Sequence, residues 1–157
     1  MTHKQLVDVA HKWVLKNGSC GVVFKELKAS TIYNEIPDVI GFGSFVHSVL
    51  IECKTSRSDF IADKKKYFRI NSDKGVGRQR FYCCPTNLIK IEELPDGWGL
   101  IYVNDKFKAI CLHNPYKGLP EVRHKGFEPN LDADRNIMYS ALRRLQVKGL
   151  VKEIYNK

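Results

Sequence analysis

The segment from 47 to 54, HSVLIECK, constrains the fold of this chain more than any other stretch. Its apolar run Val49–Ile51 is rich in aliphatic residues, which favours a buried strand. The run leads directly into Glu52, Cys53 and Lys54. Because side chains alternate along a strand, Glu52 and Lys54 emerge on one face and Cys53 on the other. A carboxylate and an ammonium at the end of a buried strand need a structural or chemical reason.

The patterns on either side of this segment alternate between helical and strand periods. Leu6, Ala10 and Val14 recur at helical spacing, and Asn17 and Gly18 follow as a helix end. The predicted elements are a helix at 3–16, strands at 20–27, 37–42 and 47–54, a basic helix at 59–69, a strand at 80–85, a short helix at 86–94, a hairpin over 97–115, an irregular segment at 114–131 and a helix at 133–148.

This order predicts an α/β protein with a mixed sheet. Short connections between the first three strands indicate an antiparallel meander, and a crossover helix pairs the third and fourth strands in parallel. Helices then cover the faces of the sheet. A length of 157 residues suits one domain, with a core of about 3–90 and a C-terminal extension of about 91–157 that adds a hairpin and a helix.

The net charge of +9 indicates a polyanionic partner. Between residues 54 and 80 there are nine Lys or Arg against three Asp. Nucleic acid is the first candidate, an anionic membrane surface is a distant second, and a solvated basic surface is the alternative. No apolar run has the length of a membrane span, and the N-terminal segment has no signal-peptide pattern, so we expect a cytoplasmic protein. The five cysteines lack metal-binding spacing and are expected to be reduced.

The carboxylates near the strand ends can hold a divalent cation. If the second and third strands pair, Asp38 lies opposite or diagonal to Glu52. Mg²⁺ binds through one or two carboxylates and keeps several waters, and it can activate a water for attack on a phosphodiester. Lys54 would orient or deprotonate that water, or neutralise charge growing on phosphorus. The alternative is an ordinary solvent-facing pair at a strand end.

The stretch PDVIGF followed by VLIECKTSRSDFIADKKK resembles the PD-(D/E)XK nuclease superfamily. Within it, the chain is most similar to small bacterial and phage proteins related to the MmcB-like DNA-repair group, over about residues 26–82. The resemblance implies a restriction-endonuclease-like fold with an α-β-β-β-α-β core. It also implies a DNA endonuclease dependent on Mg²⁺ or Mn²⁺, acting in repair, recombination or phage DNA processing.

The resemblance also assigns roles to particular residues. Asp38 and Glu52 would be metal ligands, together with the backbone carbonyl of Cys53, and Lys54 would be the catalytic lysine. Members often carry a further acid upstream, and we prefer Glu26 in the first strand for that position. Its alternative is a surface glutamate of the strand.

Other candidates for accessory roles are less specific. Glu35 is a second candidate for the upstream acid, and Asp8 is a weaker third. Gln79, Arg80 and Tyr82 stand where relatives place supporting residues on the fourth strand, although Tyr82 also suits the core.

The basic helix and the loop after it supply the expected contacts to a phosphate backbone. Asp59 is expected to begin this helix and Asp63 to pair with a nearby lysine, while Tyr67 and Phe68 are expected in the core. The predicted nucleic-acid contacts are Arg57, Lys64, Lys65, Lys66, Arg69, Lys74, Arg78 and Arg80.

Two other functions stay open at this stage. One is a nucleic-acid-binding module of the same fold without activity. The other is a winged-helix-like regulator, suggested by the tail SALRRLQVKGLVKEIYNK, although a packing helix plus an edge strand is preferred there. A homodimer is compatible with the sequence. For the enzyme, Glu52→Gln is expected to remove cleavage and leave stability within about 1 kcal/mol or improve it, because two close carboxylates repel without metal.

Overall fold

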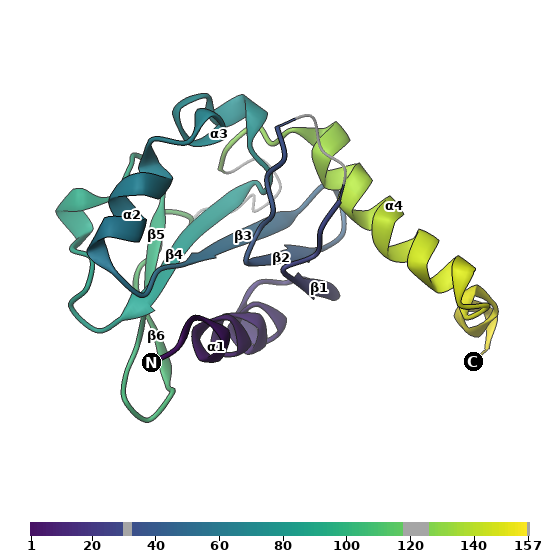
Figure 1. Cartoon of the computed structure of the whole chain (residues 1–157), viewed down its shortest axis with the longest axis horizontal. Helices are drawn as coiled ribbons and strands as arrows, with labels where there is room; N and C mark the ends of the chain where they lie inside the picture. The colour runs from purple at the N-terminus through teal and green to yellow at the C-terminus, as the bar shows by residue number, and fades with distance from the viewer. Residues whose placement is uncertain (30–32, 118–125, 157) are drawn as a thin grey trace.

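The centre of the protein is a six-stranded mixed sheet, seen in a computed structural model that describes residues 1–29, 33–117 and 126–156 (Figure 1). The strands lie in chain order across the sheet. They are β1 Val22–Lys25, β2 Val39–Phe42, β3 Ser48–Cys53, β4 Gln79–Pro85, β5 Gly99–Val103 and β6 Ala109–His113. The helices are α1 His3–Asn17, α2 Arg57–Lys64, α3 Tyr67–Ile70 and α4 Leu131–Val147, with 3-10 turns η1 Ser72–Lys74, η2 Ile91–Glu93 and η4 Val151–Tyr155.

The strand pairing follows the predicted pattern. β1, β2 and β3 form an antiparallel meander, and β3 pairs with β4 in parallel. β6 returns antiparallel to β5 as the expected hairpin, and β5 joins the sheet by pairing with β4 in parallel, which was not predicted. The order of one helix, three strands, a helix and a fourth strand is therefore confirmed.

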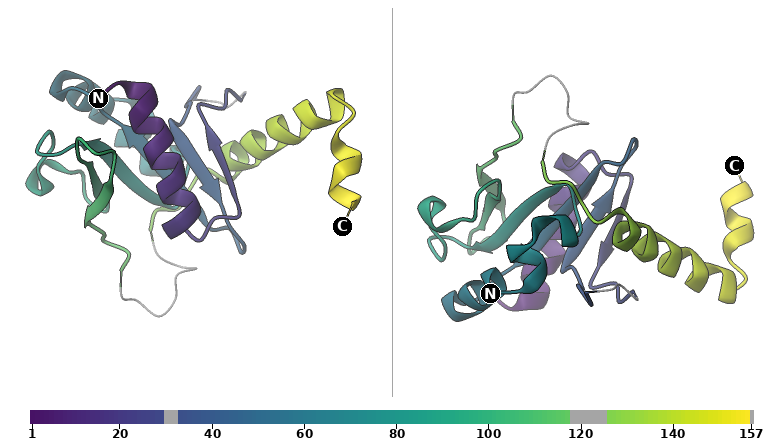
Figure 2. Two further views of the ribbon diagram at one scale, coloured as in Figure 1. Left: turned by 90° about the horizontal axis from the view of Figure 1, so that it is seen from below. Right: turned by 90° about the horizontal axis from the view of Figure 1, so that it is seen from above.

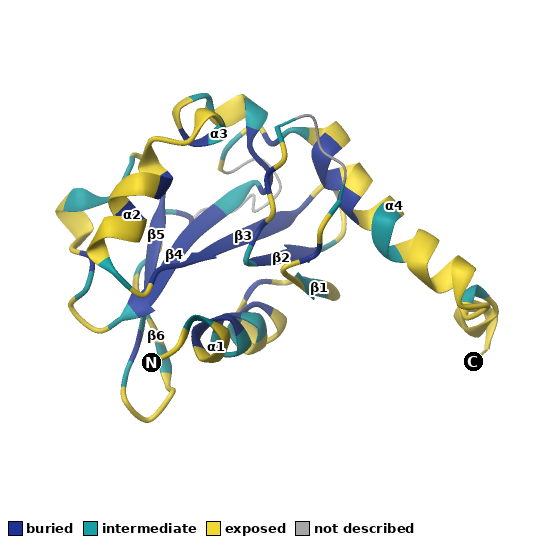
Figure 3. Cartoon of the chain, in the orientation of Figure 1, coloured by how far each residue is buried: buried dark blue, intermediate teal, exposed yellow. Residues whose placement is uncertain are grey.

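Helices cover the two faces of the sheet (Figure 2). On one face, α1 buries Leu6, Val7, Ala10 and Val14 against the odd-numbered side chains of β3 and β4. On the other, Phe60 of α2 and Ile137 of α4 pack with the even-numbered side chains. The central strands β2 to β5 are mostly buried, whereas the edge strands β1 and β6 are partly exposed (Figure 3). All five cysteines are free thiols, as expected.

The first helix is fixed at its start by Thr2. The Thr2 hydroxyl accepts the backbone N–H of Gln5 at 3.3 Å, and the Gln5 side chain accepts the backbone N–H of Thr2 at 2.8 Å. This reciprocal arrangement satisfies two donors that a helix start otherwise leaves free. The helix ends at Gly18, as predicted, and its first residue His3 is thereby held at a defined place beside the sheet.

The prediction of one continuous basic helix over 59–69 is wrong. The segment forms two short helices, α2 and α3, because Lys66 leaves the helical conformation with φ −63° and ψ 144°. The second helix therefore starts in a new direction that buries Arg69. The same turn leaves Tyr67 54% exposed, so its predicted place in the core is wrong.

The C-terminal part differs from the prediction in two places. The segment 86–94 forms only the 3-10 turn η2, and the expected edge strand in the tail is the 3-10 turn η4. Gly149, with φ +68°, lets the chain turn back after α4, and the N–H of Leu150 donates to the carbonyl of Leu145 at 2.9 Å. The tail thus has no strand to serve as a wing, which removes the basis for a winged-helix regulator.

The helix α4 is present as predicted but is buried only in its first turns, although Ala141 still packs against the core and Arg144 donates to the Lys28 carbonyl at 2.7 Å. Ala133 and Ile137 are buried, whereas Leu142 is 50% exposed. The rest of the helix projects from the body of the protein (Figure 1). Residues 118–125 of the segment expected to be irregular lie outside the described part. Among the described residues, no helix has the length and apolar character needed to cross a membrane.

Candidate functional site

The register of β2 and β3 brings Asp38 next to Glu52. Val39 lies opposite Ile51 in this antiparallel pair, so Asp38, one residue before β2, falls opposite Glu52. The Asp38 carboxylate accepts the backbone N–H of Cys53 at 2.7 Å. This bond anchors Asp38 to the end of β3, and the predicted convergence of the two acids at neighbouring strand ends is what the register produces.

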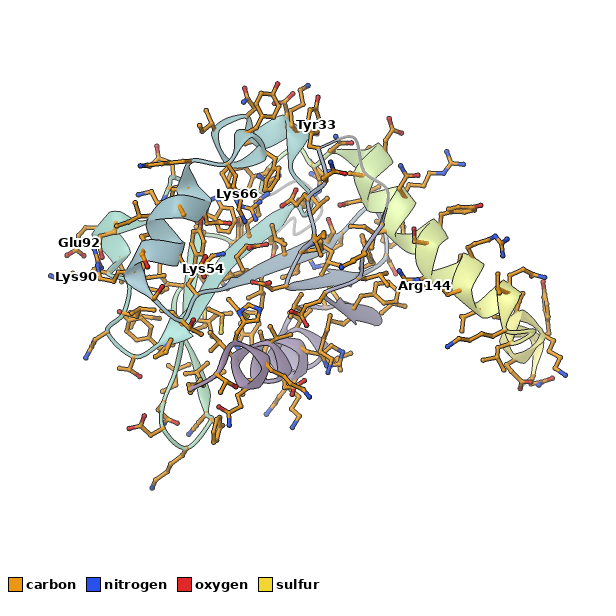
Figure 4. The ribbon with its side chains drawn as sticks, viewed as in Figure 1. Tyr33, Lys54, Lys66, Lys90, Glu92 and Arg144 are labelled. Atoms are coloured by element: carbon orange, nitrogen blue, oxygen red, sulfur yellow. The ribbon has the colours of Figure 1, made fainter. Side chains whose placement is uncertain are left out.

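Glu52 and Lys54 lie on the same face of β3, as the alternation predicted. The Lys54 ammonium is 3.2 Å from Glu52 Oε2, and both side chains are only 4% exposed. Figure 4 shows Lys54 between α2 and the sheet. The Lys54 ammonium also lies 3.3 Å from Asp63 Oδ1 and 3.9 Å from Asp59. The pair is therefore buried and not the solvent-facing pair of the alternative interpretation.

Arg69 joins three buried carboxylates. Its guanidinium contacts Glu52 Oε1 at 2.9 Å and Asp63 Oδ2 at 3.0 Å, and it also binds Glu35. Its side chain is only 2% exposed. The prediction that Arg69 contacts a phosphate backbone is therefore wrong, because the side chain is buried and each of its three guanidinium nitrogens lies against a protein carboxylate.

Asp63 links the lysine and the arginine. It is fully buried and accepts the Tyr82 hydroxyl at 2.9 Å in addition to its contacts with Lys54 and Arg69. The exposed Lys66 reaches Asp63 Oδ1 at 2.7 Å. The prediction that Asp63 pairs with a nearby lysine is confirmed, and Tyr82, a predicted supporting residue, lies in the core with a polar function.

Glu35 belongs to this network and not to the edge where Asp38 lies. Besides Arg69, it accepts the backbone N–H of Val76 at 2.8 Å. Burial raises the pKa of Glu35, and the nearby Arg69 only partly offsets this. Glu35 therefore holds the loop before β4 against the network, and we assign it a structural role.

Burial and the neighbouring charges together set the ionisation of the site. Burial, followed by repulsion from Glu52, raises the pKa of Asp38 to about 6. Burial opposes ionisation of Asp63 as well, but Arg69 and Lys54 outweigh it and lower the pKa of Asp63. Burial also acts to lower the pKa of Lys54, yet Glu52 and Asp63 outweigh it and raise the pKa overall. Lys54 is therefore a protonated ammonium at neutral pH.

Three ligand atoms suited to a cation gather at the open side of Asp38. His3 Nε2 lies 3.4 Å from both Asp38 Oδ1 and Glu26 Oε1, and the ligand atoms of the three residues all lie within 4.8 Å of one another. The Glu26 side chain is 55% exposed and that of His3 41%, so both are accessible from solvent. Two carboxylates and an imidazole are suitable ligands for Mn²⁺. The carboxylates also suit Mg²⁺, which prefers oxygen ligands.

Glu26, the preferred candidate for the accessory acid, lies just after β1 and belongs to this group, whereas His3 was missed. Glu26 follows β1 with φ +46°, and its backbone N–H donates to the Asp38 carbonyl at 3.0 Å. His3 reaches the site from the N-terminal end of α1. The available signal was its position in the first helical turn, but periodicity alone does not say which strand end that turn faces. Asp8 pairs instead with Lys25 at 2.6 Å, away from this group.

The remaining predicted nucleic-acid contacts divide by burial. Arg80 is fully buried and donates to the carbonyls of Gly77, Ser72 and Gly75 at 2.8–3.0 Å, so its predicted contact with DNA is wrong. Gln79 is half-buried at the start of β4. The other candidates are exposed or half-buried, namely Arg57, Lys64, Lys65, Lys66, Lys74 and Arg78.

Several of these exposed cations already have protein partners. Arg57 pairs with Glu93, and the Lys64 ammonium donates to the Glu93 carbonyl at 2.8 Å. Lys74 pairs with Asp73 at 2.6 Å. These exposed contacts are weak and can exchange for a phosphate. The cations border α2, α3 and η1, on the same side of the sheet as Lys54.

Comparison with known proteins places the fold but not the chemistry. No family model and no curated protein matches this chain. Among solved structures, the chain is similar to a protein of unknown function from Silicibacter pomeroyi, with a TM-score of 0.60 and 24% sequence identity. The match covers 93% of this chain and 90% of that one. This likeness supports the mixed α/β architecture over nearly the whole length.

Proposed function

We propose that this protein is a metal-dependent nuclease of restriction-endonuclease-like fold that hydrolyses phosphodiester bonds in DNA. The observation that carries the proposal is the pairing of Asp38 with Glu52 across β2 and β3, with Lys54 on the same face. The chain order of the core elements and the net charge of +9 support it. The scissile phosphate would lie at the solvent side of Asp38, next to the exposed basic residues of α2.

The residues at this edge fit a divalent cation. The network behind this edge holds three buried carboxylates, those of Glu35, Glu52 and Asp63, against the buried Lys54 and Arg69 and the exposed Lys66. Burial and then repulsion from Glu52 raise the pKa of Asp38, and a bound cation would relieve that repulsion. Asp38, Glu26 and His3 would hold it, with Glu52 behind them. When bound, Mg²⁺ or Mn²⁺ would lower the pKa of a coordinated water and polarise the phosphate.

The side chains of this chain supply the rest of the chemistry. Lys54 is protonated and held by Glu52 and Asp63, so it suits stabilisation of negative charge on the phosphate better than removal of a proton. Arg69 neutralises the inner oxygen of Glu52 and fixes its direction. The basic residues of α2 would hold the DNA backbone through exposed ammonium groups.

The test is divalent-dependent nicking of supercoiled plasmid. Wild-type protein should nick with Mn²⁺ or Mg²⁺, and Lys54→Ala and Asp38→Asn should abolish nicking. Because both residues are buried or hydrogen bonded, the exposed Glu26→Gln and His3→Gln variants provide a second test that does not depend on folding. They should raise the Mn²⁺ concentration needed for half-maximal rate and weaken Mn²⁺ binding measured by calorimetry. Glu92→Gln, an exposed acid elsewhere, is the matched control.

A binding module without activity is the second candidate. It is favoured by the two cations on Glu52, whose side chain is 4% exposed. In that case DNA binding would be independent of metal, and neither the wild type nor the Asp38→Asn protein would cleave DNA. The Asp38→Asn protein would also bind DNA as tightly as the wild type. Nicking that persists in the Lys54→Ala and Asp38→Asn proteins would come from a contaminant and would refute the nuclease.

A further inference from the structure

A groove lies between α1 and β6, on the face of the sheet opposite to Lys54. Its volume is about 660 Å³, within the range of small-ligand sites. Helix α1 forms one wall, and the β5–β6 turn together with β6 and the segment after it forms the other. It is lined by Val9, Lys12, Trp13, Lys16, Asn17, Phe107, Lys108, Ala109, Cys111, Asn114 and Lys117.

The charged residues of this groove all have the same sign. Four lysines line it, and its described lining contains no carboxylate. Within the described chain, none of the four ammonium groups has a carboxylate within ion-pair distance, and Asp8, one turn before Lys12, pairs with Lys25. Uncompensated like charges around one concavity repel each other and concentrate anions there. The groove therefore favours an anionic ligand.

The apolar part of the groove is aromatic. Trp13 is half-buried, and its ring packs against Phe81 at a centroid distance of 5.4 Å, which fixes its orientation. Phe107 is 48% exposed on the opposite wall. The backbone N–H groups of Lys106 and Lys108 donate to the Asn104 side chain at 3.0 Å, which fixes the turn that presents Phe107. A flat ring can stack on such residues.

We propose that this groove binds a nucleoside phosphate, with its base on Trp13 and Phe107 and its phosphate among the lysines. Aromatic platforms beside a basic groove are the arrangement that binds single-stranded nucleic acid. The ligand is either a free nucleotide or one unit of a single strand, which share this chemistry. The site does not rest on the proposed nuclease, because it lies on the other face of the sheet from Lys54.

The chain provides its own reporter for this site. It has two tryptophans, of which Trp98 is 2% exposed and Trp13 lines the groove. Titration with oligothymidylate or with thymidine monophosphate should quench the fluorescence of Trp13, while inorganic phosphate alone should not. In the Trp13→Phe protein this quenching should be lost. Quenching by the oligonucleotide alone assigns a strand, and equal affinity for the mononucleotide assigns a free nucleotide.

The lysines are tested by the double substitution Lys12→Gln and Lys16→Gln. It should lower affinity for oligothymidylate about tenfold and reduce the slope of log K against log salt by about 1.4, since each phosphate contact on a single strand contributes about 0.7. Lys148→Gln with Lys152→Gln, on exposed positions of the tail, is the matched control and should change neither. Both pairs remove the same charge.

The proposal is overturned if neither nucleotide probe quenches Trp13, if inorganic phosphate quenches equally, or if both lysine pairs weaken binding to the same extent. The Lys54→Ala protein separates this result from the proposed nuclease. Quenching in a wild-type protein that does not nick plasmid with Mn²⁺ or Mg²⁺ supports the groove and refutes the nuclease. Cleavage without quenching supports the nuclease and refutes the groove.

Discussion

Substitution of Glu52 by glutamine tests whether the buried network stabilises the fold. Glutamine keeps the shape of the side chain and one acceptor, but it loses the charge that faces Arg69 at 2.9 Å and Lys54 at 3.2 Å. Neither cation is left alone, because Arg69 keeps Glu35 and Asp63, and Lys54 keeps Asp63. The cost is therefore below the roughly 3–5 kcal/mol of an orphaned buried charge.

The magnitude follows from one lost hydrogen bond, which Lys54 donates to Glu52 Oε2, and one relieved repulsion. A charge-assisted hydrogen bond contributes about 1.5–3 kcal/mol, and removing Glu52 also relieves its repulsion with Asp38. We expect Glu52→Gln to lower the free energy of unfolding by about 1–2 kcal/mol, or the Tm by about 2–8 °C for a chain of this length. This reverses the expectation from sequence, which considered only the two carboxylates.

The assay is urea unfolding of metal-free protein at pH 7, followed by circular dichroism. The midpoint should fall without a change in the m-value. Glu92→Gln is the exposed control and should stay within about 0.5 kcal/mol of wild type. Arg69→Met should cost more than Glu52→Gln, because it leaves three buried carboxylates short of a cation. A Glu52→Gln protein as stable as wild type, or more stable, would show that acid repulsion dominates and would refute the reasoning.

Three further predictions follow from the described contacts. Tyr82→Phe removes a hydroxyl that donates to the buried Asp63 and should cost about 1–3 kcal/mol in urea unfolding, so an unchanged midpoint would contradict that hydrogen bond. Gly77→Ala should destabilise the fold by at least about 1 kcal/mol, because Gly77 has φ +77° and a Cβ there would lie 2.6 Å from the Cβ of Leu50. An alanine variant as stable as wild type would contradict this prediction. The pKa of Asp38 is raised in the folded state to about 6. The contribution of Asp38 to the free energy of unfolding is therefore present below about pH 4 and is lost as pH rises through 6. Metal-free wild type should therefore lose on the order of 2 kcal/mol relative to Asp38→Asn between these values, and parallel pH profiles would argue against a buried, repelled carboxylate.

The sequence alone determined the pairing of β1 to β4 and the principal pair of the site. The apolar run of β3, its alternation and the short connections before it were enough to predict the pairing with β2 and the common face of Glu52 and Lys54. These features are local, since each depends on residues adjacent in the chain or across one short connection. The hairpin of β5 and β6 was predictable for the same reason.

Only the tertiary structure decided which charges are buried and what they contact. Arg69 reads as one more cation of a basic helix, yet the break at Lys66 directs it inward to Glu35, which is 34 positions away in sequence. His3 joins Asp38 through the packing of α1 beside the strand ends. Such contacts depend on the angle at which packed elements meet, and the residue pattern of a single element does not indicate that angle.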